Sequence, residues 1–285
     1  MASLQTINRR IRSVKNTRQI TKAMQMVAAS KLRRAQVAAQ QPQAYTAAAR
    51  ALLQQFSTQT AAATHPLFVS RPVKRALTIF VAGDRGLAGG YNANVIRALA
   101  RHIHEVGGEH SAIAIGRRAA AHVARAKNIN QLAAYDVEAG DAAADIALPV
   151  LAEAIRLFTD GEVDVVHVIT TEFVSTVTQR VAVRQLLPVV LPADLQPLPE
   201  ASTEPEPEEL VEFAVRRVLE AEVTQAILEA RASEQAARMM AMMNATENAD
   251  DIIADLTLVY NNERQSGITQ QISEISAGAE AITAS

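Results

Sequence analysis

The chain has 285 residues but no cysteine and no tryptophan, and only 4% of its residues are aromatic. Without cysteine, a disulfide framework, a thiolate metal site and a thiol nucleophile are all excluded. Because 49% of the residues are nonetheless hydrophobic, this composition favours long helices over an all-β sandwich, which usually relies on aromatic and β-branched side chains. No run of about 18 uninterrupted apolar residues occurs, so the sequence predicts no membrane-spanning helix. The first residues also lack the apolar core of a signal peptide, so we expect a protein that faces the cytosol.

Acidic residues are missing from the first part of the chain. Residues 1–83 contain 13 Lys and Arg and no Asp or Glu, whereas residues 200–285 contain 17 Asp and Glu against 5 Lys and Arg. The formal net charge of −2 therefore hides one basic and one acidic block. Such blocks usually indicate a charged partner surface. Their opposite signs also favour pairing of the two ends of the chain with each other.

Glycine and proline are absent from residues 1–41. The apolar residues there recur at intervals of three and four, which is the spacing of a narrow helical seam, with one shorter step near Thr17. They are Leu4, Ile7, Ile11, Val14, Ile20, Met24 and Val27. The helical pattern resumes after Pro42, so we assign a first coiled-coil helix to residues 1–60.

The C-terminal segment lacks glycine and proline from residue 208 to residue 266. Its seam comprises Met239, Met242, Thr246, Ala249, Ile253, Leu256 and Tyr260, and it resumes one position out of phase with Ile268, Ile272, Ile275, Ala279 and Ile282. Pro207 followed by two glutamates is a favourable helix start. We therefore assign a second coiled-coil helix, on the order of 110 Å long, to residues 208–285, and a Pro-rich acidic linker to residues 193–207. Helices with such narrow seams are not stable alone, so the two are predicted to wrap each other.

The middle of the chain has a different pattern. Short apolar runs typical of strands occur at residues 75–83, 111–116, 162–173 and 176–189, and helical patterns occur at residues 95–106 and 142–158. Strands that alternate with helices predict an α/β unit with a largely parallel sheet. The predicted fold is thus an α/β domain, residues 73–192, plus a long α-helical coiled coil of the two terminal helices.

The Gly-rich stretch GDRGLAGGYNANV, residues 83–95, directly follows the first predicted strand. A turn of this kind between a strand and a helix often binds phosphate. The stretch matches neither G-x-G-x-x-G nor G-x-x-x-x-G-K-[ST]. A tight turn that uses Gly86, Gly89 and Gly90 for positive φ or close packing is therefore favoured over a nucleotide site.

Other motifs point to packing or to partners rather than to catalysis. Among the six histidines only His102 and His104 are close in sequence, and on a helix they point to different faces. The methionines of RMMAMM, residues 238–243, fit seam packing better than a soft binding surface. The basic residues of the first helix suit either an acidic protein partner or nucleic acid, and the scarcity of aromatic residues disfavours nucleic acid. We predict no catalytic residue, no metal ligand and no cofactor.

Three blocks of the sequence resemble the gamma subunit family of the F-type ATP synthase. They are IRSVKNTRQITKAMQMVAASKLRRAQ (residues 11–36), DRGLAGGYNANV (84–95) and ASEQAARMMAMMNATENADDIIADLTLVYNNERQSGITQQISEISAGAEAI (232–282), in the order and spacing of that family. The resemblance implies an antiparallel coiled coil with a Rossmann-like α/β domain. It also implies a non-catalytic central stalk that rotates inside a ring of three alpha and three beta subunits.

The resemblance further implies contacts of the α/β domain with an epsilon subunit and with the membrane-embedded c ring. The protein would then lie peripherally on the cytoplasmic face of a bacterial cell membrane. Residues that match positions near the acidic lever loop of the beta subunit are Lys22, Met24, Lys31 and Arg33. Arg264 and Gln265 match positions that hydrogen-bond an acidic beta loop, and the apolar end would turn in a hydrophobic sleeve through Ile268, Ile272, Ile275 and Ile282.

One departure from the family and two rival functions stay open from the sequence. Gly267 stands where the family usually has alanine or serine, which costs up to ~1 kcal/mol of helix stability. One rival is a nucleotide-binding α/β enzyme with helical arms, which would bind or turn over ATP without partner subunits. The other is a basic helical nucleic-acid binder, which would show salt-sensitive binding to duplex DNA.

Overall fold

A computed structural model describes residues 4–57, 65–137, 142–190 and 207–283 of the chain. These residues form two compact units. The helix-pair unit combines the residues up to Val27 with those from Met239 onward, and the sheet unit runs from Ala28 to Arg238. Two long helices, α1 (Leu4–Ser57) and α6 (Pro207–Thr283), contribute to both units. In the described part of the chain, no helix has both the length and the apolar character needed to cross a membrane.

Several predicted boundaries can be compared with these elements. Helix α6 begins at Pro207, as the proline followed by two glutamates predicts, and α1 continues without interruption past Pro42 to Ser57. The predicted linker, residues 193–207, lies almost entirely outside the described residues. The division into domains at residues 60, 73, 192 and 207 stays a prediction.

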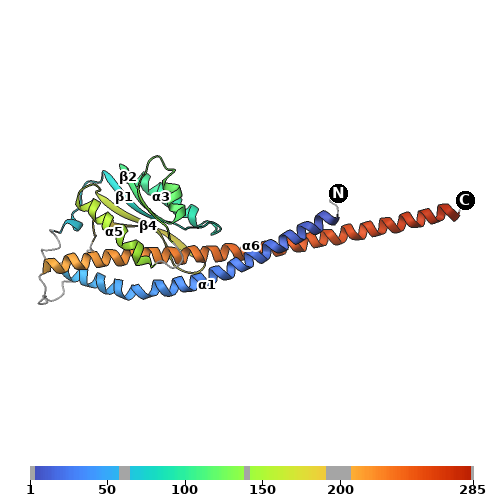
Figure 1. Cartoon of the computed structure of the whole chain (residues 1–285), viewed down its shortest axis with the longest axis horizontal. Helices are drawn as coiled ribbons and strands as arrows, with labels where there is room; N and C mark the ends of the chain where they lie inside the picture. Colours follow the sequence, from blue (N-terminus) through green and yellow to red (C-terminus); the bar gives the residue numbers. More distant parts are fainter. Residues whose placement is uncertain (1–3, 58–64, 138–141, 191–206, 284–285) are drawn as a thin grey trace. The chain divides into compact units, whose positions relative to one another are not determined.

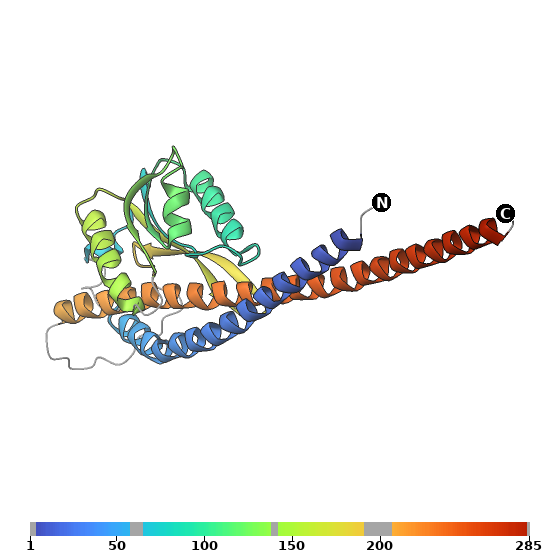
Figure 2. The same cartoon turned by 45° about the vertical axis from the view of Figure 1, so that its right-hand side comes forward.

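The helix-pair unit is an antiparallel pair of helices, with the start of α1 beside the later part of α6 (Figure 1). Figure 2 shows the same two segments side by side after rotation of the view. Two contacts establish the direction: Arg18 bonds to Asp250, and Thr21 lies against Thr246. Residue numbers rise on one helix as they fall on the other, so the antiparallel coiled coil is confirmed.

The inward face of α1 differs from the predicted seam. Ile20 and Val27 are 60% and 56% exposed, while Thr21 and Ala28 are buried. The buried and half-buried positions keep an unbroken alternation of four and three residues: Ile7, Ile11, Val14, Arg18, Thr21, Gln25, Ala28 and Leu32. The shorter step predicted near Thr17 is wrong, because polar residues occupy the seam in the middle of an otherwise regular heptad pattern.

The sheet unit contains a five-stranded sheet in the order β3-β2-β1-β4-β5. The strands are β1 (Arg75–Val81), β2 (Glu109–Ile115), β3 (Asn130–Tyr135), β4 (Val165–Phe173) and β5 (Gln179–Leu187). The first four run parallel, and β5 pairs antiparallel with β4 at the edge. This is a Rossmann-like strand order, and it confirms the predicted α/β domain with a largely parallel sheet.

Helices cover both faces of the sheet. Helices α3 (Tyr91–Val106) and α4 (Arg117–Val123) pack on one face with Phe80, while α5 (Ala143–Thr159) and the first part of α6 pack on the other. A short 3-10 helix, η1 (Pro66–Phe68), joins the core on the α5 side through Leu67. The alternation of side chains along β1 divides the two cores, because Leu77 and Ile79 face α5 whereas Phe80 faces α3.

One strand and one helix of the sheet unit do not follow from the sequence pattern. Strand β3 has the sequence NQLAAY, in which half-buried and exposed residues alternate, and α4 has the sequence RRAAAHV. Both are short and rich in alanine, whose small side chain gives little periodic signal. Strand β3 lies at the edge of the sheet and pairs in parallel with β2. The hydrogen bonds of this pairing hold it in place.

Candidate partner-binding surface and the filled crevice of the sheet

A polar layer sits inside the helix pair. The hydroxyls of Thr21 and Thr246 lie 2.8 Å apart. Thr246 also bonds to the carbonyl oxygen of Met242 at 2.8 Å, and Thr21 to that of Arg18 at 3.0 Å. Both threonines are buried, and their two hydroxyl protons are shared among these three contacts, so each hydroxyl has a partner within the helix pair. A buried polar pair at one level of an apolar seam favours a single register of the two helices.

Small and medium side chains fill the rest of this seam. Ile7 is buried at one end, and Met242 and Ala249 lie buried on the α6 side of the threonine layer. The predicted α6 seam is confirmed from Met239 to Tyr260, where every member is buried or half-buried. At the rim, Arg18 donates to Asp250 in an exposed ion pair, which selects orientation more than it adds stability.

The predicted partner residues on α1 have accessible side chains. Lys22 is exposed and Met24 half-buried in the helix-pair unit, and Lys31 and Arg33 are exposed on the part of α1 that belongs to the sheet unit. One turn farther along the same face as Lys22 lies Met26, which is 61% exposed. An exposed strip of basic and apolar side chains on a helix suits a protein partner with acidic and apolar groups.

Arg264 and Gln265 are exposed on α6 and form a second group. Since Thr21 is level with Thr246, Lys22 is level with about residue 245 of α6. At a rise of 1.5 Å per residue, Lys22 and Arg264 are therefore separated by roughly 28 Å along the axis of the helix pair. The predicted residues of the helix-pair unit are therefore not brought together into one site. They lie on two separate parts of the helix pair.

The isoleucines near the end of α6 do not take part in the seam with α1. Ile268, Ile272 and Ile275 are 49%, 60% and 72% exposed, and the side chain of Ile282 lies outside the described residues. In the antiparallel register, Leu4 is level with about residue 263, so α6 continues past the first described residues of α1. Figures 1 and 2 show this end of α6 without α1 beside it. The spacing that resumes at Ile268 therefore does not pack on the described part of α1, and the predicted contact of these isoleucines with a hydrophobic sleeve stays a prediction.

A second candidate site follows from the topology of the sheet. The strand order places β1 between β2 and β4, and the chain returns to β4 through α5 on the opposite face. In folds of this type, ligands bind in the crevice at the carboxyl ends of the two strands where the order reverses. Here that point lies between β1 and β4, next to the Gly-rich stretch.

Helix α6 fills this crevice. Thr170 of β4 donates to the carbonyl oxygen of Ala226 at 3.0 Å, and Ser233 donates to that of Thr171 at 3.2 Å. Tyr91, at the start of α3, donates to the carbonyl oxygen of Ala230 at 3.2 Å. Burial raises the pKa of Tyr91 above its usual range, which keeps the phenol a donor at physiological pH. The place of a nucleotide in related folds is thus taken by the chain's own helix.

The Gly-rich stretch packs closely on α6. A Cβ at Gly83 would lie 2.9 Å from the carboxyl carbon of Glu234, and Arg238 donates to the carbonyl oxygen of Gly86 at 3.4 Å. Glu234 and Arg238 pair with each other at 2.5 Å with little exposure. Gly89 has a φ of +54°. Close packing is thus confirmed at Gly86 and positive φ at Gly89. The prediction is wrong for Gly90, which has a φ of −81° and ordinary space for a Cβ.

Two groups of residues were not identified from the sequence. The spacing of the apolar residues of α1 does not reveal Arg18 and Thr21, because both are polar. Continuing the step from Ile7 and Val14 by sevens would have reached Thr21 and Ala28. The contacts of α6 with the sheet carry no local signal, since Thr170 lies 56 residues from Ala226 and Ser233 lies 62 residues from Thr171.

Comparisons with known proteins agree over the full length of the chain. The family model described as ATP synthase matches residues 3–282. The gamma chain of Acidithiobacillus ferrooxidans ATP synthase is 41% identical over 298 residues, covering 99% of this chain and 100% of that protein. The gamma chain of Heliobacterium modesticaldum is 38% identical with the same coverage.

Solved structures share the fold at low sequence identity. The rotor of the Euglena gracilis mitochondrial ATP synthase matches with a TM-score of 0.65 and 18% identity, covering 93% of this chain and 98% of that chain. A chain of the Tetrahymena thermophila central stalk and c ring matches with a TM-score of 0.61 and 22% identity, covering 79% of this chain and 99% of that one. On the full-length family match and the identity to bacterial gamma chains, this chain belongs to the ATP synthase gamma chain family.

Proposed function

We propose that this chain is the central rotating stalk of an F-type ATP synthase and that it is not itself catalytic. The observation that carries the proposal is the antiparallel pair of two unlike helices in a chain that matches gamma chains from end to end. Because its two helices differ, such a pair presents a different surface on each of its sides. As it rotates, each surrounding catalytic subunit contacts one of these surfaces after another. A contact shifts the conformational equilibrium of a catalytic subunit only if it is stronger in one conformation than in the other.

The partners follow from the family. Three alpha and three beta subunits surround the helix pair, and the sheet unit contacts the epsilon subunit and the c ring. Proton flow through the c ring turns the stalk, and ATP is made or hydrolysed on the surrounding subunits. The protein then lies peripherally on the cytoplasmic face of the cell membrane. This function needs no cofactor, metal or nucleic acid in the chain itself.

Three surfaces of the helices meet these partners. Lys22, Met24, Lys31 and Arg33 contact the acidic lever loop of the beta subunit. Arg264 and Gln265 hydrogen-bond an acidic beta loop, and each charge-assisted bond is worth about 1.5–3 kcal/mol. The exposed isoleucines Ile268, Ile272 and Ile275, with Ile282, turn in a hydrophobic sleeve. Their exposure supports this role, because apolar side chains without a partner in the chain mark a binding surface.

The first test is assembly. Co-expression with alpha and beta subunits should yield a complex with three alpha, three beta and one copy of this chain. The purified chain alone should neither bind nor hydrolyse ATP in the presence of magnesium, because α6 occupies the crevice of the sheet. Tight ATP binding or turnover by the chain alone would favour the nucleotide-binding enzyme instead, and salt-sensitive retention on duplex DNA would favour the nucleic-acid binder.

The second test is Arg264→Ala in the assembled complex. Loss of charge-assisted bonds to the beta subunit should weaken ATP-driven rotation and ATP synthesis at least several-fold while the fold stays intact. Arg12→Ala removes an exposed arginine from α1 outside the predicted contacts and is the matched control. Rotation and synthesis at wild-type levels in Arg264→Ala would count against this contact, with circular dichroism verifying the fold of both variants.

A further inference from the structure

The carboxyl edge of the sheet holds α6 by directional bonds as well as by apolar packing. Ala226, Glu229, Ala230 and Ser233 lie three, four and seven residues apart, so they share one face of the helix. Each of them bonds to the sheet or to Tyr91. Apolar contact alone is non-directional, whereas hydrogen bonds at several points resist both sliding of a helix and its rotation about its own axis.

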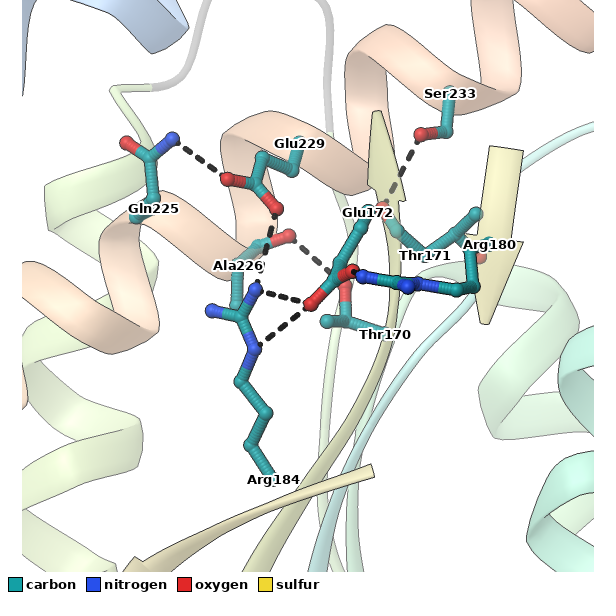
Figure 3. Close-up of polar contacts among 9 residues, drawn as sticks. All are labelled: Thr170, Thr171, Glu172, Arg180, Arg184, Gln225, Ala226, Glu229 and Ser233. Atoms are coloured by element: carbon teal, nitrogen blue, oxygen red, sulfur yellow. Dashed lines mark hydrogen bonds and ion pairs between the residues drawn. The ribbon is translucent and has the colours of Figure 1, made fainter. Parts of the chain in front are cut away.

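An ion-pair network extends this attachment, as Figure 3 shows. The carboxylate of Glu172 on β4 accepts from Arg184 of β5 and, at 2.7 Å, from Arg180. Arg184 in turn reaches Glu229 of α6 at 3.8 Å, and Gln225 donates to Glu229 at 2.9 Å. Glu172 is only 16% exposed, so solvent screens this network less than it screens a surface pair. Bonds from Arg184 and Arg180 lower the pKa of Glu172 and keep it ionised near neutral pH.

Together these contacts tie α6 to β4 and β5 on one side and to the start of α3 on the other. We name this set the α6 clamp and define it as Tyr91, Thr170, Glu172, Arg184, Glu229 and Ser233. The core on the α5 side includes α6 residues up to Ala230, while Ala237 packs against the core on the α3 side. Within the sheet unit, α6 therefore crosses from one face of the sheet to the other at the clamp.

We propose that the α6 clamp is the joint at which torque passes from the sheet unit into α6, with Glu172, Thr170 and Ser233 as its positioning residues. The inference rests on the proposed rotor function, in which the sheet unit is driven and α6 carries the motion onward. A force that turns the sheet unit acts sideways on α6 where the two are joined. The bonds at Ala226, Glu229 and Ser233 oppose slippage there because breaking them leaves buried polar groups without partners.

The test uses the complete ATP synthase carrying the triple variant Thr170→Val, Glu172→Gln, Ser233→Ala. These substitutions remove two hydrogen bonds to α6 and the negative charge that holds Arg184 of β5, and they keep nearly the same side-chain volumes. The expected result is ATP hydrolysis within twofold of wild type, with ATP-driven proton pumping per ATP hydrolysed reduced at least fivefold. All rates are measured well below the thermal unfolding midpoint of each complex, so that a loss of stability alone leaves the ratio unchanged.

The matched control is Arg156→Gln. Arg156 on α5 pairs with Glu153, Asp160 and Glu162 in the same unit, and none of these partners belongs to α6, so its loss removes an ion-pair network that does not hold α6. This control should keep the wild-type pumping ratio. Restoring Ser233 and replacing Glu172 by aspartate in the triple variant should recover part of the ratio, because a carboxylate and a hydroxyl return to the clamp.

The outcomes separate the two proposals. Failure of the wild-type chain to assemble with alpha and beta subunits would overturn the proposed function. A coupled wild-type complex together with an unchanged pumping ratio in the triple variant would overturn the clamp alone, as would an equal loss in Arg156→Gln. If the triple variant does not assemble, Glu172→Gln and Ser233→Ala are measured singly, and a wild-type ratio in both would overturn the clamp.

Discussion

At the scale of single residues, a cluster of two buried histidines, His102 and His110, and one half-buried histidine, His167, stands out in the sheet unit. His102 of α3 and His167 of β4 have ring centroids 4.4 Å apart in an edge-on arrangement, and His110 of β2 lies near both. Burial lowers the pKa of all three, that of His167 to about 4, and their mutual proximity lowers those of His102 and His167 further. Glu105 partly opposes the shift of His102. In the described residues, no group of three His, Asp or Glu side chains is arranged to hold a metal ion.

This cluster predicts a loss of stability in mild acid. The folded-state pKa of each histidine lies below the usual 6.5, so between about pH 4 and 6.5 the unfolded chain binds more protons. The stabilising contribution is complete above that range and is lost as the pH falls through it. His167→Gln should make the unfolding midpoint temperature less dependent on pH between about 7 and 5, while the exposed His104→Gln should not. Equal pH dependence in the wild type and His167→Gln would contradict this assignment.

At the scale of elements, the regular alternation of inward positions decides what each long helix can contact. Helix α1 keeps its heptad pattern by placing Thr21 and Gln25 in the seam and Arg18 at its rim, and so leaves Ile20 and Val27 exposed. Helix α6 keeps its pattern to Tyr260, after which the isoleucines turn to another face. Exposed apolar residues that are out of phase with the seam are therefore candidates for contact with another protein, and they do not mark an irregularity in the helix.

Gly267 offers a test of the end of α6. It lies inside the helix, and an added Cβ would have no heavy atom within 4 Å. Gly267→Ala should therefore stabilise this helix end by about 1 kcal/mol, seen as slower amide hydrogen exchange around residues 264–272. Gly116→Ala is the contrasting variant, because Gly116 has a φ of +99° and a Cβ there would meet the carbonyl oxygen of Ala82 at 2.2 Å. It should lower the unfolding midpoint, and unchanged exchange in Gly267→Ala would refute the free space inferred at that site.

At the scale of the whole molecule, both units are built on the same two helices. Helix α1 and helix α6 each run without a break from one unit into the other along the chain. Each unit takes its core from segments that are far apart in sequence. The proposed rotor function requires that the paired segments turn as one body.

A disulfide across the helix pair tests this requirement. The chain has no native cysteine, and the hydroxyls of Thr21 and Thr246 already lie 2.8 Å apart, so Thr21→Cys with Thr246→Cys should form a disulfide on oxidation. Oxidised complexes should keep at least half of the ATP hydrolysis and rotation of the reduced complexes, because the bond ties groups that move together. Each single cysteine variant serves as a control. Strong inhibition on oxidation that a reductant reverses would show that the helices must move apart.

The sequence by itself determined the two long helices, the start of α6 at Pro207, the strands β1, β2, β4 and β5 and the family. These features arise from local periodicity, from helix-start residues and from long motifs, all of which can be recognised in the sequence without knowing which residues are in contact in the fold. The sequence around Gly86 likewise shows by itself that it matches no nucleotide-binding motif.

Tertiary structure alone decided the register in which α1 and α6 pair, the small elements β3 and α4, and the seating of α6 in the crevice of the sheet. The position of Thr21 opposite Thr246 depends on the register of two segments more than 200 residues apart. The contacts of Thr170 and Ser233 likewise depend on the path of a distant helix. Such long-range contacts are fixed by the packing free energy of the whole chain, to which no single stretch of sequence gives a local clue.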